Sequence, residues 1–146
     1  MAIPDFTRAD SPDWAPLLEA AWAARAHAHA PYSGFRVGAA LLWSGDRIES
    51  GCNVENAAYP LTVCAERNAM AAAVAKGLRD GDPVALVVVT EAATLTPPCG
   101  GCRQVLAEFA SRLPVLLANR GTRSLHDLAD LLPHAFTGRN LTSGTL

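Results

Sequence analysis

The 146-residue chain has no long hydrophobic run and no excess of basic residues. Twelve Lys and Arg against 14 Asp and Glu give a formal net charge of -2, which argues against a strongly basic nucleic-acid binder. No apolar run approaches the ~20 residues that a membrane helix needs. Residues 1–6 also lack the basic and apolar blocks of a signal peptide. We therefore expect a soluble, cytoplasmic protein without nucleic-acid or membrane partners.

Half of the residues are hydrophobic, which is enough to fill a core. No repeat, linker or charge run divides the chain, so residues 1–146 are expected to form a single domain.

The hydrophobic pattern predicts helices that alternate with strands. Ser11, Pro12 and Asp13 are typical of a helix start, and apolar residues then recur at helical spacing until Pro31 ends the helix. The other expected elements are strands at 35–43, 47–54, 84–90, 114–118 and 123–125, and helices at 64–76, 101–111 and 127–132. Strand–helix–strand crossovers require parallel strands, whereas the first two strands form a hairpin around 44–46. The predicted fold class is α/β, a three-layer α/β/α sandwich around a mixed five-stranded sheet.

The four cysteines are expected to be reduced, because a chain with this core needs no disulfides. Cys64 and the pair Cys99 and Cys102 fall at two predicted helix starts beside buried strands, so their sulfurs should meet at one edge of the sheet. Helix N-termini favour thiolates. Three neighbouring thiolates repel one another unless a cation lies among them, and zinc is the natural thiophilic choice.

Three protein ligands leave one zinc position open, as in catalytic zinc sites, where the pKa of bound water falls to about 7. Glu66 follows Cys64 by two residues and is placed at the helix tip to move protons. Zn²⁺ with three thiolates carries a net negative charge, which opposes formation of hydroxide. We hypothesise that Arg67 chiefly, together with Arg103, donates hydrogen bonds to the thiolates and restores Lewis acidity.

Two other interpretations of the cysteines stay open at this point. Cys99-Gly-Gly-Cys102 at a helix start is also the thioredoxin layout, so this pair alone fits redox chemistry as well as metal binding. The third thiol at Cys64 favours the metal, because a redox pair does not need it. Cys52 could complete a closed structural site in a binding module, although a buried, inert thiol is the preferred interpretation.

Cys64-Ala65-Glu66 followed by Pro98-Cys99-Gly100-Gly101-Cys102 resembles the zinc nucleoside deaminase signature, in the version where Cys replaces His. Segments 31–40, 51–59 and 131–136 are also similar to the small homotetrameric cytidine deaminases, and the resemblance covers roughly residues 13–137. It implies a cytidine deaminase-like fold and one Zn²⁺ per chain. The implied reaction belongs to pyrimidine salvage and converts cytidine and 2′-deoxycytidine to uridine and 2′-deoxyuridine plus ammonia.

The resemblance also implies a role for individual positions. Cys64, Cys99 and Cys102 would bind zinc, and zinc-bound hydroxide would attack C4 of the pyrimidine. Glu66 would protonate N3 and carry a proton to the leaving ammonia.

The nucleoside would be held by residues from several segments. Phe35 would stack on the base, Asn53 and Glu55 would bind the ribose 3′-hydroxyl, and the backbone of Ala65 would meet the base carbonyl. Three further residues would contribute to the pocket of a neighbouring subunit in a homotetramer: Ala57, Tyr59 and Phe136.

Two related activities compete with this expectation. A blasticidin-S-type deaminase would keep the reaction and a similar three-cysteine site but change the substrate. A polynucleotide deaminase is disfavoured, since a net charge of -2 supplies no evident track for phosphates.

Overall fold

A computed structural model describes residues 3–142, which build a mixed five-stranded sheet in the order β2-β1-β3-β4-β5. The strands are β1 (Gly38–Trp43), β2 (Arg47–Cys52), β3 (Pro83–Val89), β4 (Pro114–Ala118) and β5 (Arg123–Asp127). β3 and β4 are parallel, and every other neighbouring pair is antiparallel. The parallel part is a single pair because a hairpin forms each edge of the sheet, β1–β2 at one side and β4–β5 at the other.

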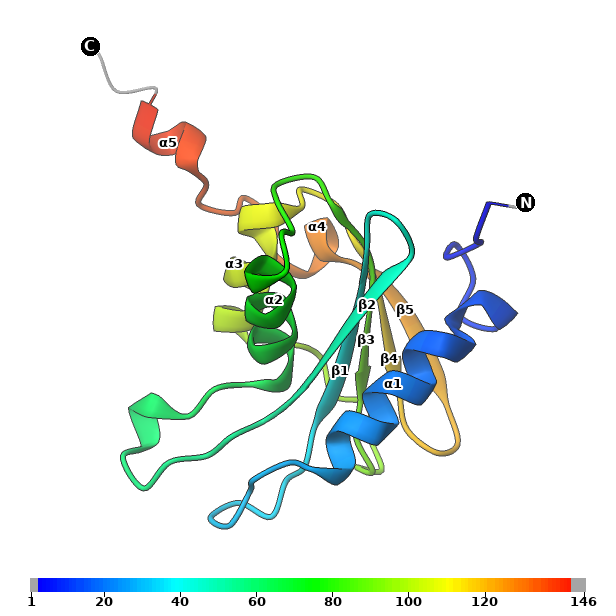
Figure 1. Ribbon diagram of the computed structural model, residues 1–146, viewed down its shortest axis with the longest axis vertical. Helices are drawn as coiled ribbons and strands as arrows, with labels where there is room; N and C mark the ends of the chain where they lie inside the picture. The colour runs from blue at the N-terminus through cyan, green and yellow to red at the C-terminus, as the bar shows by residue number, and fades with distance from the viewer. Residues whose placement is uncertain (1–2, 143–146) are drawn as a thin grey trace.

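Helices cover both faces of the sheet (Figure 1). The α-helices are α1 (Ala15–Ala26), α2 (Ala65–Ala75), α3 (Gly100–Phe109), α4 (Leu128–Leu131) and α5 (Gly138–Thr142), and short 3₁₀ turns form η1 (Pro12–Trp14) and η2 (Tyr59–Leu61). Side chains of a strand alternate between the faces, so Leu41 joins the core under α2 and α3, whereas Leu42 joins the core under α1. The expected three-layer α/β/α sandwich is confirmed.

The hairpin of β1 and β2 is shorter than predicted at its open end. We expected strands 35–43 and 47–54, but β1 begins at Gly38 and β2 ends at Cys52. The side chain of Asn53 explains the difference, because it takes the backbone bonds that a longer ladder would use. Its Nδ2 donates to the Phe35 carbonyl at 2.8 Å, and its Oδ1 accepts from the Val37 N–H at 2.9 Å.

The first helix also ends before Pro31, at Ala26. The chain leaves the helix early because His29 donates its N–H to the Asn53 carbonyl at 3.0 Å and forms a parallel bridge with Val54. Helix α5 was not predicted, and it projects from the body of the molecule in Figure 1. The other expected elements are confirmed to within two residues at each end.

Gly51 lets α2 approach β2 closely. A Cβ at this position would lie 2.5 Å from both the Ala65 carbonyl oxygen and the Ala69 nitrogen. Gly51→Ala should therefore push α2 off the sheet and lower the free energy of unfolding by about 3 kcal/mol, measured by denaturant titration. Gly138→Ala is the matched control, because its Cβ would meet nothing within 4 Å. Equal stability of the two variants would contradict this close packing.

Among residues 3–142, no helix combines the length and the apolar character that crossing a membrane requires.

Candidate active site and metal centre

The N-termini of α2 and α3 meet at one end of the sheet. β3 connects the C-terminal end of α2 to the loop that precedes α3, so both helices begin at the same end of the sheet. Cys64 and Cys99 have extended backbone conformations and occupy the N-cap positions of α2 and α3, and Cys102 lies in the first turn of α3. The Cys99 sulfur accepts a hydrogen bond from the Cys102 N–H at 3.4 Å.

The three predicted sulfur ligands are close together. The Sγ atoms of Cys64, Cys99 and Cys102 all lie within 4.8 Å of one another, and those of Cys64 and Cys99 are 3.9 Å apart. A tetrahedral zinc with Zn–S bonds of about 2.3 Å holds its sulfurs about 3.8 Å apart. The cluster therefore has the donor set and the spacing of a three-cysteine zinc site, and Cys52 is not part of it.

Two thiols of the cluster, Cys64 and Cys102, differ strongly in acidity. Hydrogen bonding with Cys102 is the main cause that lowers the pKa of Cys64 to about 6, and the charge of Arg67 contributes in the same direction. The pKa of Cys102 is raised, chiefly by its hydrogen bond with Cys64 and by burial. The Cys64 thiolate thus forms readily, whereas burial and neighbouring negative charge oppose ionisation of Cys102.

Glu66 places a carboxyl group beside the cluster, in the first turn of α2. The residue is only 5% exposed, and burial is the main cause that raises its pKa above the ordinary value. Negative charge on Cys64 raises it further. A carboxyl group in this environment holds a proton more readily than a solvated one, which suits a proton carrier.

The two arginines next to the ligands differ in their surroundings. Arg67 is exposed, and it acts on Cys64 through its charge. Arg103 donates from Nε to the Pro98 carbonyl at 2.8 Å and from Nη1 to the Leu131 carbonyl at 2.6 Å. It thereby ties the loop before Cys99 to the end of α4. Hydrogen bonds from either arginine to the thiolates stay a prediction.

Three predicted nucleoside-binding residues form one unit. Asn53 bonds to the backbone of Phe35 as described above, and the Phe35 side chain is 43% exposed. The Glu55 carboxylate accepts from the backbone N–H groups of Tyr32 and Ser33, at 2.9 and 3.2 Å, and from the Ser33 hydroxyl. The Ser33 hydroxyl is the main cause that lowers the pKa of Glu55. Tyr32 and Ser33 are not among the site residues predicted from the sequence, and their position in segment 31–40 is the only signal that indicates them.

The residues expected to serve a neighbouring subunit lie on the surface. Ala57 and Tyr59 belong to the projecting loop 54–63, whose ends pair through a bridge between Val54 and Val63 (Figure 1). Tyr59 is 69% exposed and contacts Tyr32 edge to face, with ring centroids 5.7 Å apart. Phe136 is 59% exposed, and its carbonyl accepts from Gln104 of α3. Ala65, by contrast, is fully buried at the start of α2.

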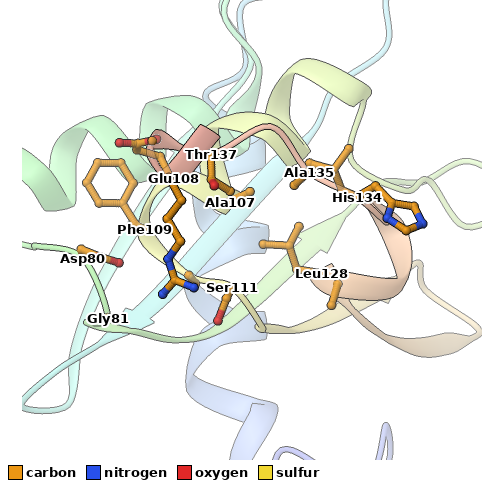
Figure 2. A pocket seen from close by; sticks show the side chains of 15 residues that line it. Asp80, Gly81, Ala107, Glu108, Phe109, Ser111, Leu128, His134, Ala135 and Thr137 are labelled. Atoms are coloured by element: carbon orange, nitrogen blue, oxygen red, sulfur yellow. The ribbon is translucent and has the colours of Figure 1, made fainter. Parts of the chain in front are cut away.

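The sulfur cluster is open to the surface, since Cys99 is exposed. Two cavities lie elsewhere. One, of about 620 Å³, lies between the C-terminal end of α3, α4 and the segment that precedes α5, where Figure 2 shows Phe109, Leu128 and His134 among its lining residues. The other, of about 610 Å³, is lined by residues that include Trp22 and Arg120. Neither cavity is lined by the cysteines of the cluster.

Comparison with known proteins agrees with this geometry. Residues 14–117 match the family described as "Cytidine and deoxycytidylate deaminase zinc-binding region". A cytidine deaminase of Sporosarcina psychrophila is 47% identical over 121 residues, which cover 82% of this chain and 88% of that protein. The crystal structure of a cytidine deaminase from Burkholderia pseudomallei superposes with a TM-score of 0.80 at 48% identity, covering 84% of this chain and 98% of that one. A more distant relative, blasticidin-S deaminase of Bacillus cereus, is 30% identical over 107 residues, covering 69% of this chain and 76% of that protein.

Proposed function

The chain belongs to the cytidine and deoxycytidylate deaminase family, and on that premise we propose that it hydrolyses cytidine and 2′-deoxycytidine to uridine and 2′-deoxyuridine with release of ammonia. The activity is that of a zinc-dependent hydrolase, with a place in pyrimidine salvage. The observation that carries the proposal is the convergence of Cys64, Cys99 and Cys102 at two helix N-termini, with the buried carboxyl of Glu66 beside them.

The donor set fits zinc, and Cys64, Cys99 and Cys102 would hold it. When bound, zinc supplies Lewis acidity and makes water a nucleophile near neutral pH. Glu66 takes the proton of the attacking water and delivers it to N3 of the pyrimidine. It then takes the proton of the new C4 hydroxyl and delivers it to the 4-amino group. The C4–N bond breaks, ammonia leaves, and the C4 oxygen becomes the carbonyl of the product. The raised pKa of Glu66 supports this role, because a carboxyl that both takes and releases protons should not be strongly acidic.

The rest of the nucleoside would lie against Phe35, Asn53 and Glu55. The exposed ring of Phe35 offers a face on which the base can stack. Asn53 and Glu55 would supply polar groups for the ribose 3′-hydroxyl, and the backbone of Ala65 would meet the base carbonyl.

We further propose a homotetramer in which Ala57, Tyr59 and Phe136 complete the site of a neighbouring subunit. Support comes from the exposure of Tyr59 and Phe136 and from the open surface around Cys99. A second copy of the chain would bury these apolar groups and enclose the substrate. Sedimentation of the active enzyme as a monomer would contradict this. We place the enzyme in the cytoplasm, where thiols stay reduced and free to bind zinc.

Arg67 is proposed to tune the metal through Cys64, because its charge favours the thiolate. Arg67→Gln should weaken zinc binding and alter the pH–rate profile, and no change in either would rule out this role.

The proposal is tested by following the ultraviolet spectrum of cytidine, 2′-deoxycytidine and blasticidin S with the purified enzyme. Cytidine and 2′-deoxycytidine should be deaminated with much higher kcat/KM than blasticidin S, because Phe35, Asn53 and Glu55 are proposed to bind the base and ribose of a free nucleoside. Blasticidin S is the second candidate substrate because a blasticidin-S deaminase is among the relatives. A higher kcat/KM for blasticidin S would reverse the assignment, and inactivity on all three substrates would contradict the proposed function.

A further inference from the structure

The hydrogen bonds around Glu55 lead to a residue outside the predicted site. We propose that Ser33 is a positioning residue, which fixes the Glu55 carboxylate and the Phe35 backbone as one unit for binding the ribose and the base. The inference rests on the proposed function, because it assigns Ser33 a part in binding the same nucleoside.

The Ser33 hydroxyl has one partner on each side. It donates to Oε1 of Glu55, and its oxygen accepts the backbone N–H of Phe35 at 2.9 Å. The backbone N–H of Ser33 also donates to Oε2 of Glu55. Ser33 therefore links the residue proposed to bind the ribose to the residue proposed to stack on the base, although Phe35 and Glu55 are 20 positions apart in the chain.

The bonds to Glu55 also determine what the carboxylate can still accept. A carboxylate offers about four lone-pair sites. Oε2 accepts from the N–H groups of Tyr32 and Ser33, and Oε1 accepts from the Ser33 hydroxyl. Among the described residues these three bonds leave one site on Oε1, which can accept from a hydroxyl of the substrate.

Asn53 complements this remaining site. After its bonds to Phe35 and Val37, the amide retains one N–H donor and one acceptor lone pair. A hydroxyl both donates and accepts, so an acceptor on Glu55 and a donor on Asn53 together match the ribose 3′-hydroxyl. Ser33 sustains this match by keeping Oε1 of Glu55 in place.

The loop that contains Ser33 is not held by strand hydrogen bonds, so the bonds of Ser33 to Glu55 and Phe35 restrain it. Residues 31–37 precede β1 and lie outside the strands, and residues 31–36 are exposed. Holding a loop in its binding conformation before the ligand arrives lowers the cost of ordering it on binding. Because Ser33 contacts neither Glu66 nor the cysteines through the hydrogen bonds above, its loss should weaken nucleoside binding and leave the chemical step intact.

The first test compares Ser33→Ala with Ser33→Thr, which keeps the hydroxyl at an exposed position. For cytidine, Ser33→Ala should raise KM about fivefold and change kcat by less than about twofold, since a lost hydrogen bond to a charged group is only partly transmitted to the substrate. The Kd for uridine, measured by titration calorimetry, should rise by a similar factor. Ser33→Thr should restore both constants, and Ser50→Ala on β2 is the matched control that should change neither.

The second test removes the group that Glu55 is proposed to bind. With 3′-deoxycytidine as substrate, Ser33→Ala should raise KM by clearly less than the rise of about fivefold expected with cytidine, because only the link to Phe35 still contributes. The proposal is overturned if Ser33→Ala leaves KM and Kd unchanged, if Ser33→Thr fails to restore them, or if the loss is as large for 3′-deoxycytidine. Failure of the proposed function would look different, because the wild-type enzyme would then not deaminate cytidine at all.

Discussion

Replacement of Glu66 by glutamine is expected to lower kcat for cytidine by about 10²–10⁴-fold, the usual contribution of a positioned acid–base group. The amide has nearly the same size and shape as the carboxyl, but it cannot take a proton from water and pass it to N3 or to the leaving amino group. Because zinc is held by the three cysteines, the zinc content of the variant should stay at about one atom per chain. Steady-state kinetics and metal analysis on the same preparation measure both quantities.

The thermal midpoint of Glu66→Gln should stay close to that of the wild-type protein. Glu66 is nearly fully buried, and burial disfavours its charged form, so a neutral amide of equal volume costs little. Glu19→Gln, at an exposed position of α1, is the matched control and should be fully active. If Glu66→Gln retained more than about a tenth of the wild-type kcat, proton transfer would have to be assigned to another group.

Replacement of Cys99 by serine should remove zinc and activity together while the chain stays folded. A neutral hydroxyl is a much poorer zinc ligand than a thiolate, and two remaining sulfurs do not make a stable site. We expect zinc affinity to fall more than about 100-fold, beyond the 10–100-fold that the loss of an outer partner of a ligand costs. Competition with a chelator measures this affinity.

The fold should tolerate this change for two reasons. Cys99 is exposed at the N-cap of α3, where its sulfur accepts the Cys102 N–H, and serine is a preferred N-cap residue that can accept the same bond. The two hydrophobic cores, one on each face of the sheet, also do not depend on Cys99. Cys52→Ser is the matched control and should keep zinc and activity, since Cys52 lies outside the cluster. Loss of zinc in both Cys99→Ser and Cys52→Ser would show that Cys52 is also a zinc ligand.

The sequence predicted the architecture well because its signals are local. The run of apolar residues in β4, the Ala-rich α2 and the Ser11 cap each act within a few residues, and their elements formed where expected. The convergence of Cys64, Cys99 and Cys102 could also be predicted, because β3 leads from α2 to α3 and this topology places both helix starts at one edge. The organisation of residues 1–146 as a single domain stays a prediction.

The misplaced boundaries and the unpredicted contacts arise from side chains that bond to a distant backbone. The Asn53 side chain takes the ladder bonds of the Phe35 carbonyl and the Val37 N–H, and no propensity at residues 35–37 indicates this. Its spacing from Cys102 suggested Arg103 as a partner of the thiolates. Arg103 also bonds to the carbonyls of Pro98 and of Leu131, and Leu131 lies 28 positions after Arg103 in the chain. The contact of Ser33 was unpredicted for the same reason, because its hydrogen-bond partner Glu55 is 22 positions away in the chain.

The central claim is that three cysteines hold one zinc and leave a fourth position for solvent, and X-ray absorption at the zinc edge of the purified enzyme tests it most directly. The account predicts about three sulfur neighbours at about 2.3 Å and one oxygen or nitrogen neighbour at about 2.0 Å. The same spectrum should be obtained for Glu66→Gln, because this carboxyl is not a ligand. Four sulfur neighbours, or a folded protein purified and reconstituted with zinc that retains none, would contradict the account.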